Sequence, residues 1–222
     1  MKQFFRSARL LILFLFLPFF DGSTRPPFIQ TSYIYGYNNS MVVAEVTHAG
    51  KDQIAFSSFE TATDKGYWQY AGTTSSPGRT GTQYYTLASG SIQRLGLPRG
   101  KYTLSYWANT AASVTGTNYT LVNQHTDASI NGWTYYETTF LLSLDNSSIT
   151  LSGTANLDEL RLYPFDAMMS TSTYDPLVGK TSETDANHVT TFYEYDAFHR
   201  LKRVKDQYGN ILKQLVYHYK GQ

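Results

Sequence analysis

The chain contains no cysteine and few charged residues, and each shortage excludes a class of protein. Without cysteine no disulfide scaffold can form. Charged residues make up 16% of the 222 residues, against about 25% in an average soluble protein, and they nearly cancel to a net +1. The aromatic share of 16% excludes an intrinsically disordered chain, which has few aromatic residues and a high net charge. The same composition excludes a collagen and a coiled coil.

Tyrosine, by contrast, is abundant, with 19 residues. Tyr and Thr favour pleated, half-buried strands. Short strand-like segments recur between turn-rich segments such as 72–81 and 96–100, which is typical of a sandwich or barrel. We therefore predict an all-β fold. The expected strands of its central part are Met41–Thr47, Gln53–Phe59, Gln83–Ala88, Lys101–Ala108, Asn118–Val122, Trp133–Leu142, Ser148–Ser152 and Leu157–Tyr163.

Residues 1–23 have the layout of an export signal. Residues 1–9 carry three basic side chains, and the run Leu10–Phe20 that follows is apolar. Eleven helical residues reach only about 16 Å, roughly half of the hydrocarbon core of a membrane. We therefore predict an exported protein, secreted or at the cell surface, that meets the membrane only through this segment, as a cleaved signal peptide or as an anchor. Residues 24–40 are predicted to be a linker or edge segment, because they contain Pro26-Pro27.

Charge is distributed unevenly along the chain. Residues 197–222 carry a net charge of +5, whereas residues 10–196 carry −7. A basic tail can indicate binding to nucleic acid or anionic lipid. Here the basic residues alternate with apolar ones, as on the solvated face of a strand. We therefore expect no nucleic-acid partner.

The last third of the chain contains a repeat of about 21 residues. Tyr174-Asp175 recurs as Tyr195-Asp196, and Tyr217-His218 follows 22 residues later with histidine in place of aspartate. Each unit reads as strand, turn and strand. Because a single hairpin is barely stable alone, we predict that the units stack into an extended sheet, with the tyrosines packed between hairpins. Two of the expected strands are Thr190–Tyr195 and Ile211–Tyr219.

The segment TTFYEYDAFHRL at 190–201 resembles the YD repeat of Rhs-type bacterial surface proteins, whose motif runs Tyr-Asp-x-x-Gly-Arg-Leu. Tyr195-Asp196 and Arg200-Leu201 match that motif. His199 stands where glycine is usual, and His188 likewise occupies a place where a turn glycine would be expected. The resemblance covers about 173–219 and implies a domain of YD-repeat hairpins at 168–222.

The middle of the chain resembles the galactose-binding-like jelly rolls found as carbohydrate-binding modules. The resemblance rests on the order of five segments over residues 54–163, and it implies a jelly-roll β-sandwich domain at 41–167. In such modules a glutamate and an aspartate commonly hold a structural calcium ion, and here these would be Glu60 and Asp158. Carbonyl groups of the loop 78–81 would then complete the oxygen ligands. The five segments are Ser58-Phe59-Glu60, Gly78–Gly81, Gly100–Trp107, Trp133–Tyr136 and Leu157–Leu162.

No catalytic motif is present. The sequence has no HExxH, no Walker loop, no GxSxG and no cysteine nucleophile, and its five histidines show no metal-ligand spacing. Asp158 and Glu159 are adjacent acids, but neighbouring side chains of a regular strand point to opposite faces. We therefore expect that they do not share one substrate, as a glycosidase pair must. The chain is predicted not to be an enzyme.

Three aromatic residues are candidates for saccharide binding, which requires exposed rings with polar neighbours. These are Trp107, Trp133 and Tyr135, of which the last two share a strand face. Trp133 is expected in the core, because it opens a strand whose later residues are apolar. For Trp107, which shares its face with Thr103 and Ser105, core and surface interpretations both stay open.

Three hypotheses follow for the function. The leading one is an exported, non-enzymatic cell-surface or adhesion-type Rhs-repeat protein, short or truncated, with a glycan or another surface protein as partner. The second is a carbohydrate-binding module for a wall or matrix glycan, which predicts an exposed aromatic platform containing Trp107 or Trp133. The third is a shell remnant of a polymorphic toxin.

Overall fold

The computed structural model describes residues 30–218, and their regular structure is almost entirely β-strand. The only helical elements in this range are two single 3-10 turns, Lys51–Gln53 and Leu87–Ser89. The all-β prediction is therefore confirmed. The strands are β1 (Thr31–Gly36), β2 (Met41–Thr47), β3 (Ala55–Ser57), β4 (Thr74–Ser75), β5 (Tyr84–Thr86), β6 (Ile92–Leu97), β7 (Gly100–Ala108), β8 (Ser113–Gly116), β9 (Tyr119–Thr126), β10 (Thr134–Leu142), β11 (Ser147–Ser152), β12 (Asn156–Pro164), β13 (Met168–Asp175), β14 (Gly179–Thr184), β15 (Thr190–Tyr195), β16 (Leu201–Lys205) and β17 (Ile211–Gln214).

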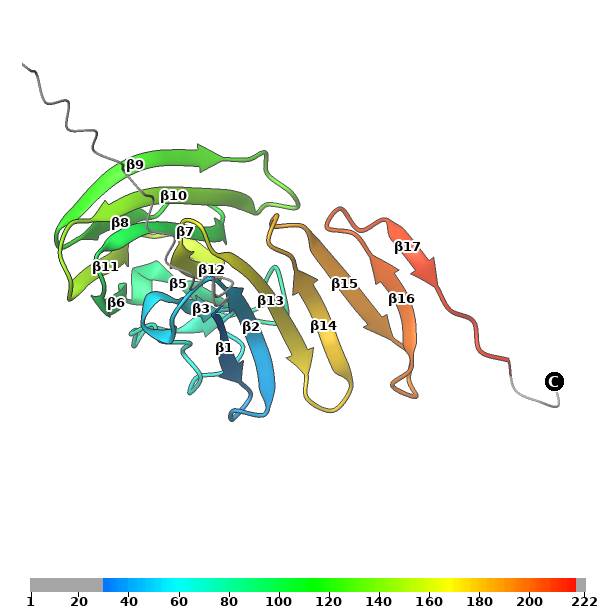
Figure 1. Ribbon diagram of the computed structural model, residues 1–222. Helices are drawn as coiled ribbons and strands as arrows, with labels where there is room; N and C mark the ends of the chain where they lie inside the picture. Colours follow the sequence, from blue (N-terminus) through cyan, green and yellow to red (C-terminus); the bar gives the residue numbers. More distant parts are fainter. Residues whose placement is uncertain (1–29, 219–222) are drawn as a thin grey trace, which may run out of the picture.

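Two antiparallel sheets form a sandwich (Figure 1). The main sheet has the order β4-β5-β12-β7-β10-β9, with β3 also paired to β12, and the small sheet has the order β6-β11-β8. Alternate residues of β7 point into the core between them, as the strand period requires. The largest core side chains include Tyr85, Tyr102, Leu104, Phe140, Ile149 and Leu157.

The third sheet, here called the hairpin sheet, has the order β1-β2-β13-β14-β15-β16-β17. It joins the N-terminal hairpin to the C-terminal strands, because β2 pairs with β13 and places Thr47 opposite Met168. The sandwich is thus inserted between two neighbouring strands of this sheet. Residues 31–36, expected in a linker or edge segment, form strand β1, and 41–47, expected to open the sandwich, belong to the hairpin sheet.

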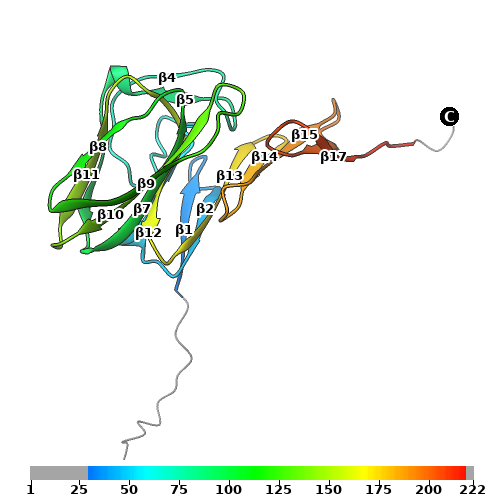
Figure 2. The same ribbon diagram turned by 90° about the horizontal axis from the view of Figure 1, so that it is seen from above.

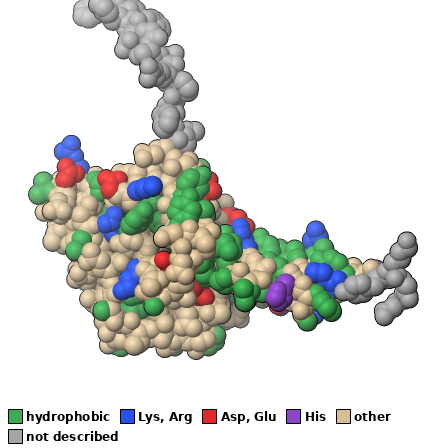
Figure 3. Space-filling view, turned by 90° about the horizontal axis from the view of Figure 1, so that it is seen from below, with side chains coloured by type: hydrophobic (Ala, Val, Ile, Leu, Met, Phe, Trp, Pro, Cys, Tyr) green, Lys and Arg blue, Asp and Glu red, His purple; other side chains and the backbone are tan. Residues whose placement is uncertain are grey.

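The hairpin sheet leaves the sandwich as an arm that ends at β17 (Figure 2). Its first strands pack on β3 and β12 through a second apolar cluster that contains Ile34, Val46, Phe56, Tyr163 and Met169. Farther out, hydrophobic and basic side chains are exposed on the arm (Figure 3). The outer face of the main sheet is therefore covered where the two parts meet, which explains why β7 is buried on both faces from residue 102 to 108.

Four aspartates begin the turns that connect β13 to β17, and each caps its turn in the same way. The Oδ1 atom accepts a backbone N–H from the residue two positions later, at 2.8–3.1 Å. This is the local bond by which Asp favours turns. Each structural repeat therefore includes the aspartate-capped turn as well as the pair of strands that it connects. The four aspartates are Asp175, Asp185, Asp196 and Asp206.

Two histidines adopt a turn conformation that normally favours glycine. His188 has φ 65° and His199 has φ 59°, whereas the equivalent position of the β16–β17 turn holds Gly209 with φ 89°. A side chain in this left-handed region costs roughly 1–2 kcal/mol, partly offset by the greater chain entropy that glycine loses on folding.

We expect His199→Gly to increase the free energy of unfolding by about 0.5–1 kcal/mol, because the strain at φ 59° exceeds the entropy cost of glycine. Urea denaturation measures the change. Gln124→Gly on the exposed strand β9 is the control and should destabilise the protein by about the same amount. A loss of stability in both variants would contradict the strain at His199.

The repeat tyrosines tie each hairpin to the strand before it. Their hydroxyl groups donate to backbone carbonyls: Tyr174 to Val42 at 3.0 Å, Tyr195 to Lys180 at 2.9 Å, and Tyr217 to Leu201 at 2.8 Å. The first of these bonds reaches β2, so the N-terminal hairpin serves as the neighbour of the first repeat. The tyrosines act through a hydrogen bond as well as through packing.

Candidate functional site

A β-bulge shapes the junction between the sandwich and the hairpin sheet. The pairing of β12 with β7 shifts register between Asp158 and Arg161, and Glu159 has φ 53°. Because of this bulge both acids reach the same hydroxyl: Thr80 Oγ1 lies 3.4 Å from Asp158 Oδ2 and 3.0 Å from Glu159 Oε1. The expectation that the two side chains point to opposite faces is wrong, because it assumed an unbroken strand.

Asp158 is fully buried, and backbone N–H groups surround its carboxylate. Its Oδ2 accepts from Arg79 N at 2.7 Å and from Thr80 N at 2.8 Å, and its Oδ1 accepts from Glu159 N at 2.7 Å. Burial, together with the nearby charge of Glu159, raises the pKa of Asp158 well above its ordinary value. Through its hydrogen bonds to Arg79 N and Thr80 N, the carboxyl group fixes the loop 79–80 on the outer face of the main sheet.

Two arginines connect this cluster to the hairpin sheet. Arg161 Nη2 lies 2.9 Å from Glu159 Oε2, and Arg161 Nη1 donates to the carbonyl of Asp185 at 3.3 Å. Arg79 Nη1 donates to Thr190 Oγ1 on β15 at 3.0 Å. Burial lowers the pKa of Arg79 to about 10, so this side chain stays charged at neutral pH. The two acids and two arginines form a buried, hydrogen-bonded network.

Glu60 binds the other end of the same loop. Its carboxylate accepts backbone N–H groups of Thr82, at 2.8 and 2.9 Å, and of Gln83, at 2.8 Å. A side chain at Gly81, where φ is 58°, would place Cβ 2.3 Å from Glu60 Cδ, so this close approach requires glycine. Burial raises the pKa of Glu60 from its ordinary value.

These contacts do not fit the expected calcium ion. A hard cation needs six to eight oxygen ligands, with loop carbonyls among them, but the loop directs N–H groups toward both Glu60 and Asp158. In residues 30–218, no three His, Cys, Asp or Glu side chains form a cluster that could hold a metal ion. The loop itself holds the two carboxylates in place.

We therefore expect calcium and chelator to leave the midpoint of thermal unfolding unchanged, with magnesium as the ion control. Calorimetry of the full chain measures it. A rise of the midpoint in calcium that disappears in Glu60→Ala would show that the loop rearranges around an ion, contrary to this expectation.

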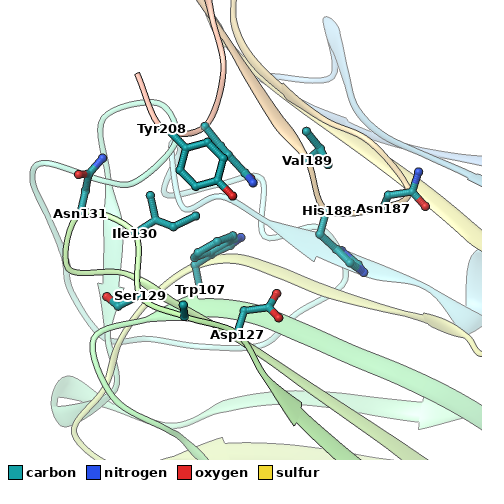
Figure 4. A pocket seen from close by; sticks show the side chains of 11 residues that line it. Trp107, Asp127, Ser129, Ile130, Asn131, Asn187, His188, Val189 and Tyr208 are labelled. Carbon is teal, nitrogen blue, oxygen red and sulfur yellow. The ribbon is translucent and has the colours of Figure 1, made fainter. Parts of the chain in front are cut away.

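A cleft of about 580 Å³ lies beside the network (Figure 4). Its walls are the loop that follows β9, residues 127–131, the β14–β15 turn at 187–189 and the β16–β17 turn at 207–208. Trp107 of β7 forms its floor. The cleft therefore depends on the contact between the sandwich and the hairpin sheet.

Two of the three aromatic candidates are buried at this junction. Trp107 is 4% exposed, with the guanidinium of Arg79 3.6 Å from its ring centroid and the ring of Tyr135 at 5.5 Å. Tyr135 is 3% exposed, and its ring lies 4.6 Å from that of His188. These two rings support the cleft from below and do not form an exposed platform.

The third candidate, Trp133, does not lie in the core as expected, because it precedes β10 and is only half-buried. It packs edge-to-face on Tyr84 with the ring centroids 5.8 Å apart. It lines a smaller cavity of about 160 Å³, together with Arg79 and Gln207. Ile130, Asn131 and Gln207 line both cavities, so the two are neighbours.

His188 joins the β14–β15 turn to the sandwich. Its Nε2 lies 3.4 Å from Glu137 Oε2, and the hydroxyl of Tyr135 donates to the same oxygen at 2.8 Å. The hydrogen bond from His188 is the largest cause of the lowered pKa of Glu137. A depressed carboxyl pKa contributes stability above the unfolded pKa, about 4.3 for Glu, and this contribution is lost as pH falls through the folded pKa.

We therefore expect Glu137→Gln to be less stable than the wild type at pH 6, and the difference to shrink as the pH falls through the lowered pKa of the wild-type carboxyl. Urea denaturation over a pH series that descends from pH 6 measures the difference. A constant difference would show that Glu137 acts through packing and not through its charge.

Sequence reasoning missed most of the cleft. Asn131, Asn187 and the pair Gln207-Tyr208 come from three separate segments, and only the docking of the hairpin sheet brings them to one place. The turn chemistry located the two hairpin turns, but it gave no signal that they face the loop after β9.

No protein-family model matches the chain, and no curated protein matches its sequence. Within residues 30–218, no helix is long and apolar enough to cross a membrane. The predicted export signal at 1–23 lies outside the described residues. The function must therefore be inferred from the repeated hairpins, the buried network and the cleft.

Proposed function

We propose that this chain is an exported, non-catalytic surface protein of adhesion type, built on YD-repeat hairpins. The observation that supports the proposal is the exact recurrence of two contacts, the aspartate-capped turn and the tyrosine bond to the preceding strand. A sheet made of such units is an extended scaffold, since each unit contacts only its neighbours. The expected partner is a glycan or another surface protein, bound by the hairpin sheet or by the sandwich.

The buried acids support a non-catalytic role. Asp158, Glu159 and Glu60 each accept hydrogen bonds from protein donors, and the first two are almost completely buried. A general acid or base must reach a substrate proton within hydrogen-bond distance. These carboxylates hold the loop 78–83 and the hairpin sheet in place instead.

Export is tested with the full chain in a bacterial host. The wild type is expected outside the cytoplasm and accessible to added protease, while a variant with Leu13→Arg and Leu15→Arg is retained because its apolar run is broken. Retention of both proteins in the cytoplasm would reject the exported surface role.

Saccharide recognition is the second candidate, and the cleft favours it. The aromatic platform that this hypothesis required is replaced by a hollow with Trp107 as its floor. The toxin-shell hypothesis shares the hairpin sheet with the main proposal, and none of the described contacts favours it separately.

A further inference from the structure

The cleft has the size and construction of a small-molecule site. Its volume of about 580 Å³ lies within the range of roughly 300–1,000 Å³ that is usual for such sites. Trp107 and Tyr208 lie on opposite sides of the hollow, Ile130 at one end and His188 at the other (Figure 4). A ligand in the cleft would therefore contact the sandwich and two hairpin turns at once.

Its lining offers hydrogen-bond donors and acceptors next to aromatic and apolar surface. The amides of Asn131, Asn187 and Gln207 each carry both a donor and an acceptor, and Ser129 adds a hydroxyl. Tyr208 is 63% exposed, so its ring is accessible from the cleft. The hydroxyl groups of a ring-shaped ligand can also donate and accept hydrogen bonds, so they could pair with these amides and with the Ser129 hydroxyl.

Polar atoms without protein partners belong to residues that line the cleft or the adjoining cavity. Gln207 Oε1, His188 Nδ1 and Arg79 Nη2 are buried, and no described protein atom bonds to them. An unpaired buried polar atom is unfavourable, because it has lost its hydrogen bonds to water. Gln207 and Arg79 both line the adjoining cavity, so one ligand hydroxyl that reached it could donate to the Gln207 carbonyl and accept from Arg79.

Charge excludes anions from the preferred ligands. Asp127 is the one carboxylate among the residues that line the cleft, and it is 2.7 Å from His125. Arg79 lies outside this lining, and the nearby acids Glu159 and Asp158 interact with its charge. An acidic ligand would thus meet a carboxylate and find no uncompensated cation among these lining groups.

We propose that the cleft binds a neutral saccharide of one or two rings, with its hydroxyl groups on Gln207 and the asparagine amides and a ring face against Tyr208. The inference rests on the second candidate function above, saccharide recognition, and specifies its ligand; it does not depend on export. Binding and export can therefore fail independently of each other.

The test uses saturation-transfer NMR and calorimetric titration of the full chain with a panel of neutral mono- and disaccharides: glucose, galactose, N-acetylglucosamine, maltose, cellobiose and lactose. Galacturonate is the acidic comparison. At least one neutral sugar is expected to bind saturably at millimolar concentration, and galacturonate more weakly.

Two variants locate the site. Tyr208→Ala and Gln207→Ala are each expected to weaken binding about tenfold, which corresponds to about 1.4 kcal/mol. Gln207→Ala is safe for the fold, because Ala186 and Ala197 hold this position in the preceding turns. The matched control is Phe198→Ala, which changes the position equivalent to Tyr208 in the β15–β16 turn, away from the cleft lining, and should bind like the wild type.

The proposal is overturned if no neutral sugar of the panel binds saturably, or if galacturonate binds as tightly as the best neutral sugar. It is also overturned if Tyr208→Ala and Gln207→Ala both bind like Phe198→Ala, since the sugar would then occupy another surface.

Discussion

Replacement of Asp158 by alanine is expected to lower the free energy of unfolding by about 3–5 kcal/mol, the usual cost of removing one partner from a buried ionic network. The substitution leaves the N–H groups of Arg79, Thr80 and Glu159 without their acceptor in a fully buried place. It also leaves two arginines facing one acid. Urea denaturation followed by tryptophan fluorescence measures the loss.

The same substitution should loosen the hairpin sheet, because the loop that Asp158 holds carries the Arg79 bond to Thr190. Hydrogen exchange of the β14 and β15 amides is expected to accelerate more than that of β11 in the small sheet. Asp166→Ala, at an exposed acid, is the control and should change stability by less than about 0.5 kcal/mol. Equal effects of the two substitutions would mean that the network contributes no stability.

Trp107→Ala is expected to cost about 3–5 kcal/mol, as is usual when a large buried ring is removed. The ring fills the space between Arg79 and Tyr135, so its loss leaves a cavity under the cleft and removes a cation–π contact. Thermal and urea unfolding measure the effect.

Trp133→Ala is the matched control, because the ring is half-buried and has an edge contact with Tyr84. We expect it to cost only about 1 kcal/mol. If Trp133→Ala were the more damaging of the two, the assignment of Trp107 as the buried floor of the cleft would be wrong.

Local patterns were enough to predict most of the strands. Met41–Thr47 and Thr190–Tyr195 were expected with the bounds that the structure shows, and the main strands of the sandwich agree within a few residues. Alternating side chains and turn residues are local signals, so they can be read from one segment at a time. The spacing of the tyrosine and aspartate pairs in the last third is of the same kind.

Features that depend on distant contacts could not be predicted. The pairing of β2 with β13 joins segments on either side of the whole sandwich, and no local pattern encodes that partner. The bulge at Glu159 needs a positive φ at a residue whose type does not favour it. The cleft depends on the first of these, since it forms only where the docked hairpin turns meet the sandwich.

The insertion of the sandwich between β2 and β13 has a mechanical consequence. The end of β2 and the start of β13 are paired, so the sandwich is an insertion whose first and last residues are held together by that strand pair. Tension applied through β1 and β17 runs from strand to strand across the sheet and bypasses the sandwich. The hairpins would unzip one after another from the edges, and load would reach the sandwich only after the β2–β13 pair had separated. A pulled molecule would lengthen in steps while the sandwich stays folded.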